Sequence, residues 1–362
     1  MLDVALKVLE KIESYGFKAY IVGGFVRDYV LGNKTNDVDI CTDATPKDIK
    51  EIFENITLPK TDYGAVRLDI KKHRFDIMTF RKEISYYNNR KPMEVEYIKD
   101  LLSDLQRRDF KMNTLCMDKD GNVIDLLNGK EDIENKVINT VGDSISRFVE
   151  DPLRILRAVR FYTTLGFELG EETRLAILHT KNELSRLSYQ RKKDELDKIF
   201  CHANVKRGID ILVELGLDKE LELDFKHCIY TTDLIGIWST IGINANYPFS
   251  KNERDLINKI KEVRYLNNLD YKVLFKYGLY VNIIAGSLNG TDRKEIASKF
   301  ETMPIKTKDE VNISTNQIMG ILEIEPSKKL KEIHEDLINN ILYGKVENNY
   351  EEIVKYLISK YK

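Results

Sequence analysis

The sequence contains little cysteine and no long apolar run. Its 362 residues include four cysteines, Cys41, Cys116, Cys201 and Cys228, and none of them forms a CxxC pair. This spacing indicates neither a zinc site nor a disulfide framework and is typical of a reducing compartment. No apolar run approaches the roughly 18 residues of a transmembrane helix. The first ten residues have charges within an amphipathic pattern, unlike a signal peptide, so we expect a cytoplasmic protein without a membrane span.

The chain also lacks an excess of either charge. It has 57 basic and 59 acidic residues, a net charge of −2. Bulk charge therefore does not indicate a nucleic-acid-binding protein, and any RNA would have to bind a local basic patch. None of the five histidines belongs to an HD pair, which argues against an appended phosphohydrolase domain. The length allows two or three domains with a substantial core.

The most informative stretch is residues 20–40. An apolar segment leads into Gly23-Gly24, a short helical segment follows, and a second apolar segment begins with Asp37-Val-Asp39. Because alternate residues of a strand lie on the same face, Asp37 and Asp39 are predicted to point in one direction. The apolar residues between and after them are predicted to face the core.

These residue types suit a metal-dependent nucleotide site. Two neighbouring carboxylates repel each other unless a cation lies between them, and hard oxygen ligands at this spacing suit Mg²⁺ that also holds nucleotide phosphates. The glycines allow the backbone to approach a triphosphate closely, and the helix after them offers free N–H groups to an anion. Either motif alone is common in other contexts, so the prediction depends on the order strand, GG, helix, DxD.

In this order the motifs resemble the signature of the DNA polymerase β nucleotidyltransferase superfamily. The longer form, Val22-Gly-Gly24-Phe-Val-Arg27-Asp with Asp37-Val-Asp39, resembles the branch of class II tRNA nucleotidyltransferases and bacterial poly(A) polymerases. The resemblance implies that Asp37 and Asp39 are catalytic and bind two Mg²⁺ ions. It also implies that Gly24 and Arg27 help to hold the nucleotide triphosphate.

A second stretch, Arg107-Arg108-Asp109-Phe-Lys-Met-Asn113, is similar to the family's RRDFTxNA motif. It differs in having lysine and threonine where the family usually has threonine and alanine. Arginine donates bidentate, permanently charged hydrogen bonds to phosphate, and Asp and Asn side chains can bind ribose hydroxyls. The resemblance implies that Arg108 contacts the triphosphate and that the motif also contacts the ribose.

A third stretch, Glu150-Asp151-Pro-Leu-Arg154-Ile-Leu-Arg157-Ala-Val-Arg160, resembles the family's EDxxR motif. The spacing predicts that Asp151 and Arg154 project from one helix face and that the arginines form a basic stripe. Like charges on one stripe repel, and bound phosphate or nucleic acid would relieve the repulsion. The resemblance implies that Asp151 and Arg154 bind the Watson–Crick edge of CTP or ATP and so select C and A over G and U. Arg157 and Arg160 would support nucleotide or RNA phosphate.

Three further features are less specific. Residues 66–79 alternate as a β-hairpin in which Asp76 is either a third carboxylate near the metals or a solvent-facing strand residue. Residues 80–92 resemble the flexible loop that CCA-adding enzymes use for the terminal A. Residues 187–196 loosely resemble a family helix, which either supports the template region or contacts substrate directly.

Strand patterns nearly end at about residue 145, and apolar residues then recur at spacings of three and four. We therefore predict an α+β protein with an N-terminal polymerase-β-like nucleotidyltransferase head, built on a mixed β-sheet, followed by an all-α neck, body and tail. The predicted bounds are 1–140 for the catalytic head, 141–205 for the base-recognition neck, 206–290 for the body and 291–362 for a tRNA-binding tail.

Together with the loop-like stretch at residues 80–92 and the near-neutral net charge of the chain, the resemblance implies a CCA-adding tRNA nucleotidyltransferase. Such an enzyme adds C, C and A to the tRNA 3′ end without a nucleic-acid template, using CTP and ATP and releasing pyrophosphate. The expected partners are CTP, ATP and the 3′ end and top half of tRNA, with Mg²⁺ as cofactor and no protein partner implied. CC-adding enzymes and bacterial poly(A) polymerases share the motifs and are alternatives. A small-molecule nucleotidyltransferase would not need the EDxxR stretch, and a non-catalytic RNA-binding relative should have lost a metal carboxylate.

Overall fold

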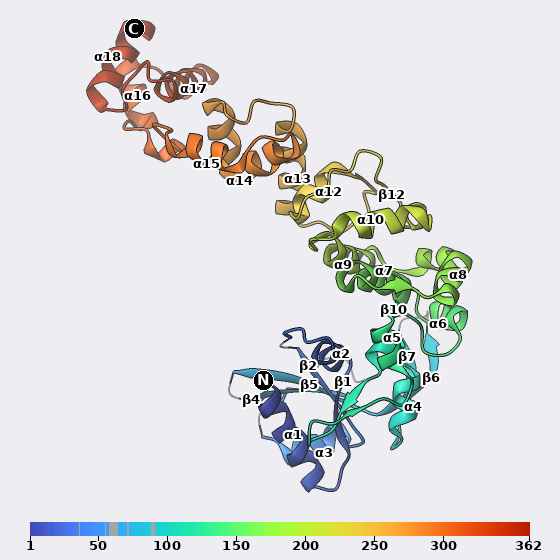
Figure 1. Ribbon diagram of the computed structural model, residues 1–362. Coiled ribbons are helices and arrows are strands. Elements are labelled where there is room, and N and C mark those ends of the chain that lie inside the picture. Colours follow the sequence, from blue (N-terminus) through green and yellow to red (C-terminus); the bar gives the residue numbers. More distant parts are fainter. Residues whose placement is uncertain (36, 55, 58–63, 71, 88–90) are drawn as a thin grey trace. The chain divides into compact units, whose positions relative to one another are not determined.

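The computed structural model describes residues 1–35, 37–54, 56–57, 64–70, 72–87 and 91–362, with the backbone alone at 83–87 and 91–95. The chain forms two compact units, Met1–Leu223 and Asp224–Lys362. Strands are concentrated near the N-terminus and mostly helices follow, which confirms the predicted α+β class (Figure 1). Among the described residues, no helix combines the length and apolar character needed to cross a bilayer.

The N-terminal part of the first unit, which we call the head as in the prediction, contains a seven-stranded mixed sheet in the order β3-β4-β5-β2-β1-β8-β9. Strands β2 and β5 are parallel neighbours, and the other neighbouring pairs are antiparallel. The strands are β1 (Ala19–Val22), β2 (Val38–Thr42), β3 (Ile56–Thr57), β4 (Ala65–Ile70), β5 (His73–Thr79), β8 (Cys116–Met117) and β9 (Val123–Ile124).

The helices of the head follow the sequence signals closely. Helix α1 (Leu2–Ser14) buries its apolar stripe. Helix α3 (Pro46–Ile52) begins with a capping box in which the side chains of Thr45 and Asp48 each bind the other residue's backbone N–H. The remaining head helices are α2 (Gly24–Val30), α4 (Leu101–Gln106), the 3₁₀ turn η1 (Lys111–Asn113) and α5 (Gly129–Glu134).

The hairpin predicted at residues 66–79 is confirmed as β4 and β5. The stretch that resembles a flexible loop is largely a second antiparallel hairpin, formed by β6 (Arg81–Tyr87) and β7 (Lys91–Tyr97). Its register shifts between Glu83 and Tyr86. Such irregularities interrupt the alternation of side chains, and this explains why the sequence did not indicate a strand there. Residues 88–90 of this stretch lie outside the described residues.

The rest of the first unit is mainly helical. Helices α6 (Ser144–Glu150) and α7 (Leu153–Leu165) are separated at Pro152, and α7 packs against α9 (Tyr189–Phe200) and α10 (Val205–Glu214). Gly208 allows the last contact, because a Cβ atom there would lie 2.6 Å from side-chain atoms of both Thr163 and Ile199. The other elements are β10 (Val137–Ile138), β11 (Glu168–Leu169), α8 (Glu171–Thr180), the 3₁₀ turn η2 (Lys181–Arg186) and α11 (Leu217–Leu221).

The second unit is almost entirely helical and has two apolar clusters, one between α13 and α14 and one centred on α17. Helix α14 is kinked at Gly278, which has a φ of 78°. Strand β12 (Leu223–Asp224) contains the last residue of the first unit and the first residue of the second. The elements after it are α12 (Leu234–Thr240), β13 (Gly242–Ile243), α13 (Lys251–Val263), α14 (Tyr271–Leu288), α15 (Arg293–Glu301), η3 (Lys308–Glu310), α16 (Thr315–Leu322), α17 (Lys328–Leu342) and α18 (Tyr350–Tyr361).

Candidate active site

A polar cavity of about 300 Å³ lies where the glycine turn, the DxD carboxylates, the RRD turn and helix α7 meet. All the predicted site residues except Asp151 and Arg154 are among its described lining residues. The lining residues are Gly23, Gly24, Phe25, Arg27, Asp28, Thr35, Asp37, Asp39, Arg108, Asp109, Asn113, Arg157, Arg160 and Phe161. Motifs that are distant in the sequence therefore form one site.

The two carboxylates of the DxD motif share one face of the sheet. Val38 between them is 1% exposed, whereas Asp37 and Asp39 line the cavity, as the alternation predicted. Burial raises the pKa of Asp39 to about 6, and the negative charge of Asp37 contributes to the rise. The metal-free site therefore carries an electrostatic cost that a bound cation would relieve.

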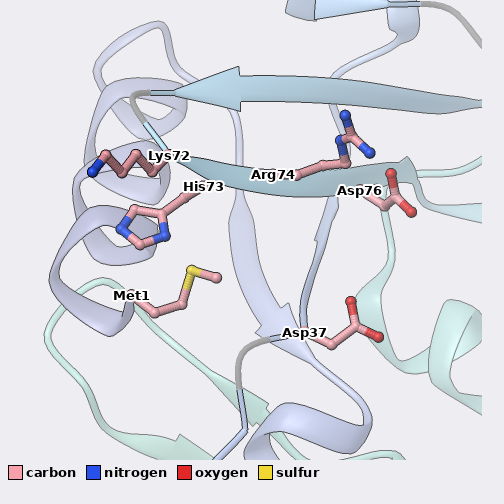
Figure 2. Close-up of a pocket in the computed structure, with 6 residues that line it drawn as sticks. All are labelled: Met1, Asp37, Lys72, His73, Arg74 and Asp76. Atoms are coloured by element: carbon pink, nitrogen blue, oxygen red, sulfur yellow. The ribbon is translucent and has the colours of Figure 1, made fainter. Parts of the chain in front are cut away.

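Asp76 lies opposite Asp39 in the parallel pairing of β2 and β5. Figure 2 shows Asp37 and Asp76 lining a neighbouring cavity, which has a volume of about 440 Å³. The carboxylate of Asp76 forms an ion pair with Arg67 at 2.9 Å. In the part of the chain that the structure describes, no three His, Cys, Asp or Glu side chains are grouped to hold a metal ion. A role for Asp76 as a third ligand therefore stays a prediction.

The glycine turn and the RRD turn are adjacent. Gly23 has a φ of 81°, in the region that favours glycine, and a Cβ atom there would lie 3.6 Å from Arg108 Nη1 and 4.0 Å from Asp39 Oδ2. Arg108 pairs with Asp104 at 3.3 Å. Its Nε is buried and has no hydrogen-bond partner among the described residues. A buried unsatisfied donor beside the carboxylates is suited to an anionic ligand.

A chain of charged hydrogen bonds joins α2 to helix α7. Arg27 Nη1 donates to Asn113 Oδ1 at 2.8 Å, Asn113 Nδ2 donates to Asp109 Oδ1 at 3.1 Å, and Arg157 Nε donates to Asp109 Oδ2 at 2.7 Å. Burial alone would raise the pKa of Asp109, but Arg157 and the hydrogen bonds more than offset it, so this pKa is lowered. Asp109 is therefore held as a buried carboxylate at one wall of the cavity.

Phe161 is one of two phenylalanines among the described residues that line the cavity, and three arginines lie close to its ring. The guanidinium carbons of Arg27, Arg157 and Arg160 lie 5.2, 5.6 and 4.3 Å from the ring centroid. Arg160 is held by Glu195, which accepts its Nε at 2.8 Å and whose side chain is 4% exposed. Sequence reasoning did not identify Phe161 or Glu195 as site residues, although Phe161 directly follows the predicted arginine stripe.

Carboxylates of the protein itself already offset the repulsion expected within the arginine stripe, so the stripe is not in itself evidence for a bound anion. Each arginine of the stripe pairs with a different carboxylate, and these carboxylates come from three separate segments of the chain. Arg154 pairs with Glu150, Arg157 with Asp109 and Arg160 with Glu195. Spacing along one helix could not reveal partners contributed by the head and by α9.

Asp151 does not share a helix face with Arg154, contrary to the prediction. Asp151 follows the last residue of α6 and has an extended backbone, with φ −139° and ψ 98°. The residue before a proline is disfavoured in helical conformation, so Pro152 breaks the helix at this point. The Asp151 carboxylate accepts hydrogen bonds from Arg191 Nη2 at 3.3 Å.

Arg154 lies in the first turn of α7 and is not among the described residues that line the cavity. Its Nη1 donates to Glu150 Oε2 at 2.9 Å and to the Arg147 carbonyl at 3.1 Å, and its Nη2 donates to the Arg107 carbonyl at 3.0 Å. In this conformation Arg154 ties the junction of α6 and α7 to the head.

Helix α9 packs against α7 and contacts residues of the EDxxR stretch and its arginine stripe. Its Arg191 contacts Asp151 and its Glu195 contacts Arg160, which favours the supporting role over direct substrate contact. Lys192 of α9 is buried, and its Nζ donates to the Glu220 carbonyl at 3.3 Å. Burial lowers the pKa of this lysine.

The mixed sheet, the paired carboxylates and the arginine-lined cavity define a nucleotidyltransferase. A family model for the poly A polymerase head domain matches residues 19–139. Models for the RNA- and SrmB-binding site of polymerase A and for tRNA nucleotidyltransferase domain 2 match residues 166–225 and 247–357.

Curated relatives are similar along the whole chain. A CCA-adding enzyme of Staphylococcus haemolyticus is 31% identical over 99% of this chain and 98% of its own length. A CCA-adding enzyme of a Geobacillus species is 33% identical over 98% of this chain and 96% of its own length. The crystal structure of Bacillus stearothermophilus CCA-adding enzyme in complex with CTP matches with a TM-score of 0.90 at 27% identity, covering 98% of this chain and 96% of that one. The chain therefore belongs to the family of CCA-adding enzymes, which confirms the family predicted from its motifs.

Proposed function

We propose that this protein adds C, C and A in turn to the 3′ end of tRNA, using CTP and ATP and releasing pyrophosphate. The observation that carries this proposal is the polar cavity in which paired carboxylates, a glycine turn and arginines of α7 meet. Relatives named CCA-adding enzymes, similar over nearly the whole chain, support it.

Asp37 and Asp39 are the metal ligands in this proposal. Family membership supports a divalent cation, and we propose Mg²⁺ because both groups are hard oxygen donors. Their mutual repulsion, expressed in the raised pKa of Asp39, fits a site that is completed by a cation. When bound, Mg²⁺ activates the RNA 3′-hydroxyl and stabilises the pyrophosphate leaving group.

The triphosphate lies against the glycine turn, with Gly24, Arg27 and Arg108 as its binding residues. The unsatisfied Nε of Arg108 supports this assignment, since a phosphate oxygen would accept from it. Asp109 and Asn113 lie between this position and helix α7. They are suited to hold the ribose hydroxyls.

Base selection is assigned to Asp151 and Arg154, with Arg157 and Arg160 supporting nucleotide or RNA phosphate. A carboxylate can accept from the exocyclic amino group that C and A share, and a guanidinium can donate to a ring nitrogen or carbonyl. To take this role, the Asp151 carboxylate must lose its ion pair with Arg191 and bind the base, and the Arg154 guanidinium must lose its ion pair with Glu150. Nucleotide binding therefore includes a local rearrangement at the junction of α6 and α7.

The predicted division into head, neck, body and tail is retained in this proposal. The head carries out catalysis, the neck contributes base recognition, and the helical remainder binds tRNA. A reducing cytoplasm, where tRNA is processed, is the proposed location.

The test supplies a tRNA transcript lacking its 3′ CCA with CTP alone, ATP alone and both, in the presence of Mg²⁺. Two additions with CTP, and a third only when ATP is also present, are expected. If addition stops after two nucleotides although CTP and ATP are both present, the protein is a CC-adding enzyme. If ATP alone gives long adenylate tails, it is a poly(A) polymerase. No incorporation would favour the small-molecule or non-catalytic alternative.

A further inference from the structure

Asp76 stands in the middle of a row of charged residues that crosses the neighbouring strands β2, β5 and β4. In the parallel pairing of β2 and β5 it lies opposite Asp39, and in the antiparallel pairing of β4 and β5 it lies opposite Arg67. Residues that lie opposite each other in a sheet project from the same face. The carboxylate of Asp76 therefore has an anionic residue on one side and a cationic residue on the other.

The cationic neighbour binds this carboxylate. Arg67 Nε donates to Asp76 Oδ1 at 2.9 Å, and Arg67 Nη2 donates to Asp76 Oδ2 at 3.5 Å. The register alone would allow Asp76 to join Asp37 and Asp39 around a metal ion. Nevertheless, among the described residues no three His, Cys, Asp or Glu side chains are grouped in this way. Asp76 is engaged by Arg67 instead.

The guanidinium of Arg67 occupies the place of a counter-ion. Carboxylates that share one face of a sheet repel each other, and Arg67 neutralises one of them in the metal-free protein. A divalent cation would offset the same repulsion with twice the charge, and it prefers the hard oxygens that Asp76 offers. Both oxygens of Asp76 accept from Arg67, and a guanidinium beside a metal ion repels it. The two cations therefore oppose each other at this carboxylate.

We propose that Arg67 competes with the divalent cation for the carboxylate of Asp76 and thereby weakens metal binding at the site. Asp76 becomes a third ligand only when it loses its ion pair with Arg67. This inference rests on the proposed metal site at Asp37 and Asp39, and it adds a residue of β4 that sets the affinity of that site. Arg67 is a positioning residue, because it acts on the metal ion through Asp76.

The same hairpin provides a matched control. Arg74 pairs with Asp69 at 2.9 Å, two residues along the hairpin from the pair of Arg67 and Asp76 and on the same face. Arg74 also lines the cavity that Asp37 and Asp76 share (Figure 2). Arg67→Gln and Arg74→Gln therefore remove the same charge from the same surroundings, but only Arg67→Gln frees the carboxylate of Asp76.

The test measures the Kd of Mn²⁺, a spectroscopic substitute for Mg²⁺, by electron paramagnetic resonance of the free ion. The full chain is used without nucleotide or RNA. Arg67→Gln is expected to lower this Kd about 2- to 5-fold, as for the removal of one partly exposed ion pair, and Arg74→Gln to lower it by less than about twofold. Arg67→Lys, which keeps the charge, should stay closer to the wild type than Arg67→Gln. In an Asp76→Asn background, Arg67→Gln should have no larger effect than Arg74→Gln.

Equal Kd values for Arg67→Gln and Arg74→Gln would overturn the competition. A higher Kd for Arg67→Gln would also overturn it, because Arg67 would then hold Asp76 where the cation needs it. An effect of Arg67→Gln that persists in the Asp76→Asn background would show that bulk charge is the cause. Melting temperatures of the metal-free variants equal to that of the wild type would show that the fold is intact.

A further variant separates this inference from the metal site on which it rests. Asp39→Asn should bind Mn²⁺ more weakly than the wild type. If it binds Mn²⁺ equally tightly, or if the wild type binds none, the proposed metal site is wrong and the competition is wrong with it. If Asp39→Asn binds more weakly but Arg67→Gln behaves like Arg74→Gln, the metal site stands and only the role of Arg67 is wrong.

Discussion

Arg157 Nε donates to Asp109 Oδ2 at 2.7 Å, and this contact joins the head to helix α7 in the lining of the proposed nucleotide cavity. Asp109 also accepts from Asn113, which in turn accepts from Arg27 of α2. The network fixes side chains that three separate motifs contribute. The shape of the cavity therefore depends on a buried charge pair as well as on the fold of the head.

The first prediction concerns the coupling between these two residues. Asp109→Asn and Arg157→Gln should each lower stability and weaken nucleotide binding, because each leaves a buried charged group without its partner. The double variant should be less impaired than the sum of the single variants, with a coupling of about 0.5–3 kcal/mol. The coupling is measured as a double-mutant cycle, from the denaturant unfolding and CTP binding of the wild type, the two single variants and the double variant. If the free-energy change of the double variant equalled the sum of those of the single variants, the contact between Asp109 and Arg157 would not stabilise the site.

The second prediction concerns Glu195 as a positioning residue for Arg160. Glu195→Gln should raise the KM for CTP and ATP about tenfold, because a charged hydrogen bond of about 1.5 kcal/mol is lost, while the tRNA Kd stays unchanged. Asp194→Asn is the matched control, since Asp194 precedes it on α9 but is exposed and pairs with Gln190. The role of Glu195 would be contradicted if Glu195→Gln and Asp194→Asn had equal KM values. It would also be contradicted if Glu195→Asp, which keeps the carboxylate, were no more active than Glu195→Gln.

The third prediction follows from the raised pKa of Asp39. In the metal-free protein this pKa is about 6, above its ordinary value of 3.8, so the folded state holds the proton more tightly than the unfolded state. The stability contributed by protonation is present below about pH 4 and is lost as the pH rises through 6. Asp39→Asn should therefore be inactive, yet more stable than the metal-free wild type at pH 7.5 by about 1–3 kcal/mol.

Thermal unfolding at pH 5 and pH 7.5, with and without Mg²⁺, checks this prediction. Mg²⁺ should raise the melting temperature of the wild type mainly at pH 7.5 and should have little effect on Asp39→Asn. A metal effect of equal size at both pH values, or a fully active Asp39→Asn, is inconsistent with a metal site at this carboxylate.

The fourth prediction concerns Arg154. Arg154→Lys keeps the charge but loses the forked guanidinium, so selection of CTP and ATP over GTP and UTP should decrease about tenfold or more. Arg147→Lys is the control, because Arg147 also pairs with Glu150 and binds a head carbonyl but has no proposed contact with the base. Nucleotide selection is measured as ratios of kcat/KM. A folded Arg154→Lys protein with unchanged selection would contradict the assignment of base recognition to this residue.

The parts of the site that were predictable from sequence are those that short spacings determine. The DxD alternation places Asp37 and Asp39 on one face, and Gly23 requires a backbone conformation that glycine favours. These features depend on neighbouring residues, so the local pattern was sufficient. The order of the motifs along the chain then identified the family.

The parts that were not predictable depend on contacts between distant segments. Glu195 reaches Arg160 from another helix, and nothing in the sequence near Arg160 indicates its partner. The shared helix face of Asp151 and Arg154 was predicted wrongly because the helical spacing was extended across Pro152. The second hairpin was missed because its shifted register obscures strand alternation.

The central claim is that one cavity between the head and α7 binds both CTP and ATP and rejects the other two nucleotides. The most direct measurement is a competition experiment in which bound labelled CTP is displaced by unlabelled ATP, GTP and UTP, without RNA. ATP should displace CTP completely, with a stoichiometry of one nucleotide per chain, while GTP and UTP displace it at least tenfold less effectively. Simultaneous binding of CTP and ATP, or equal displacement by all the nucleotides, would contradict a single selective cavity.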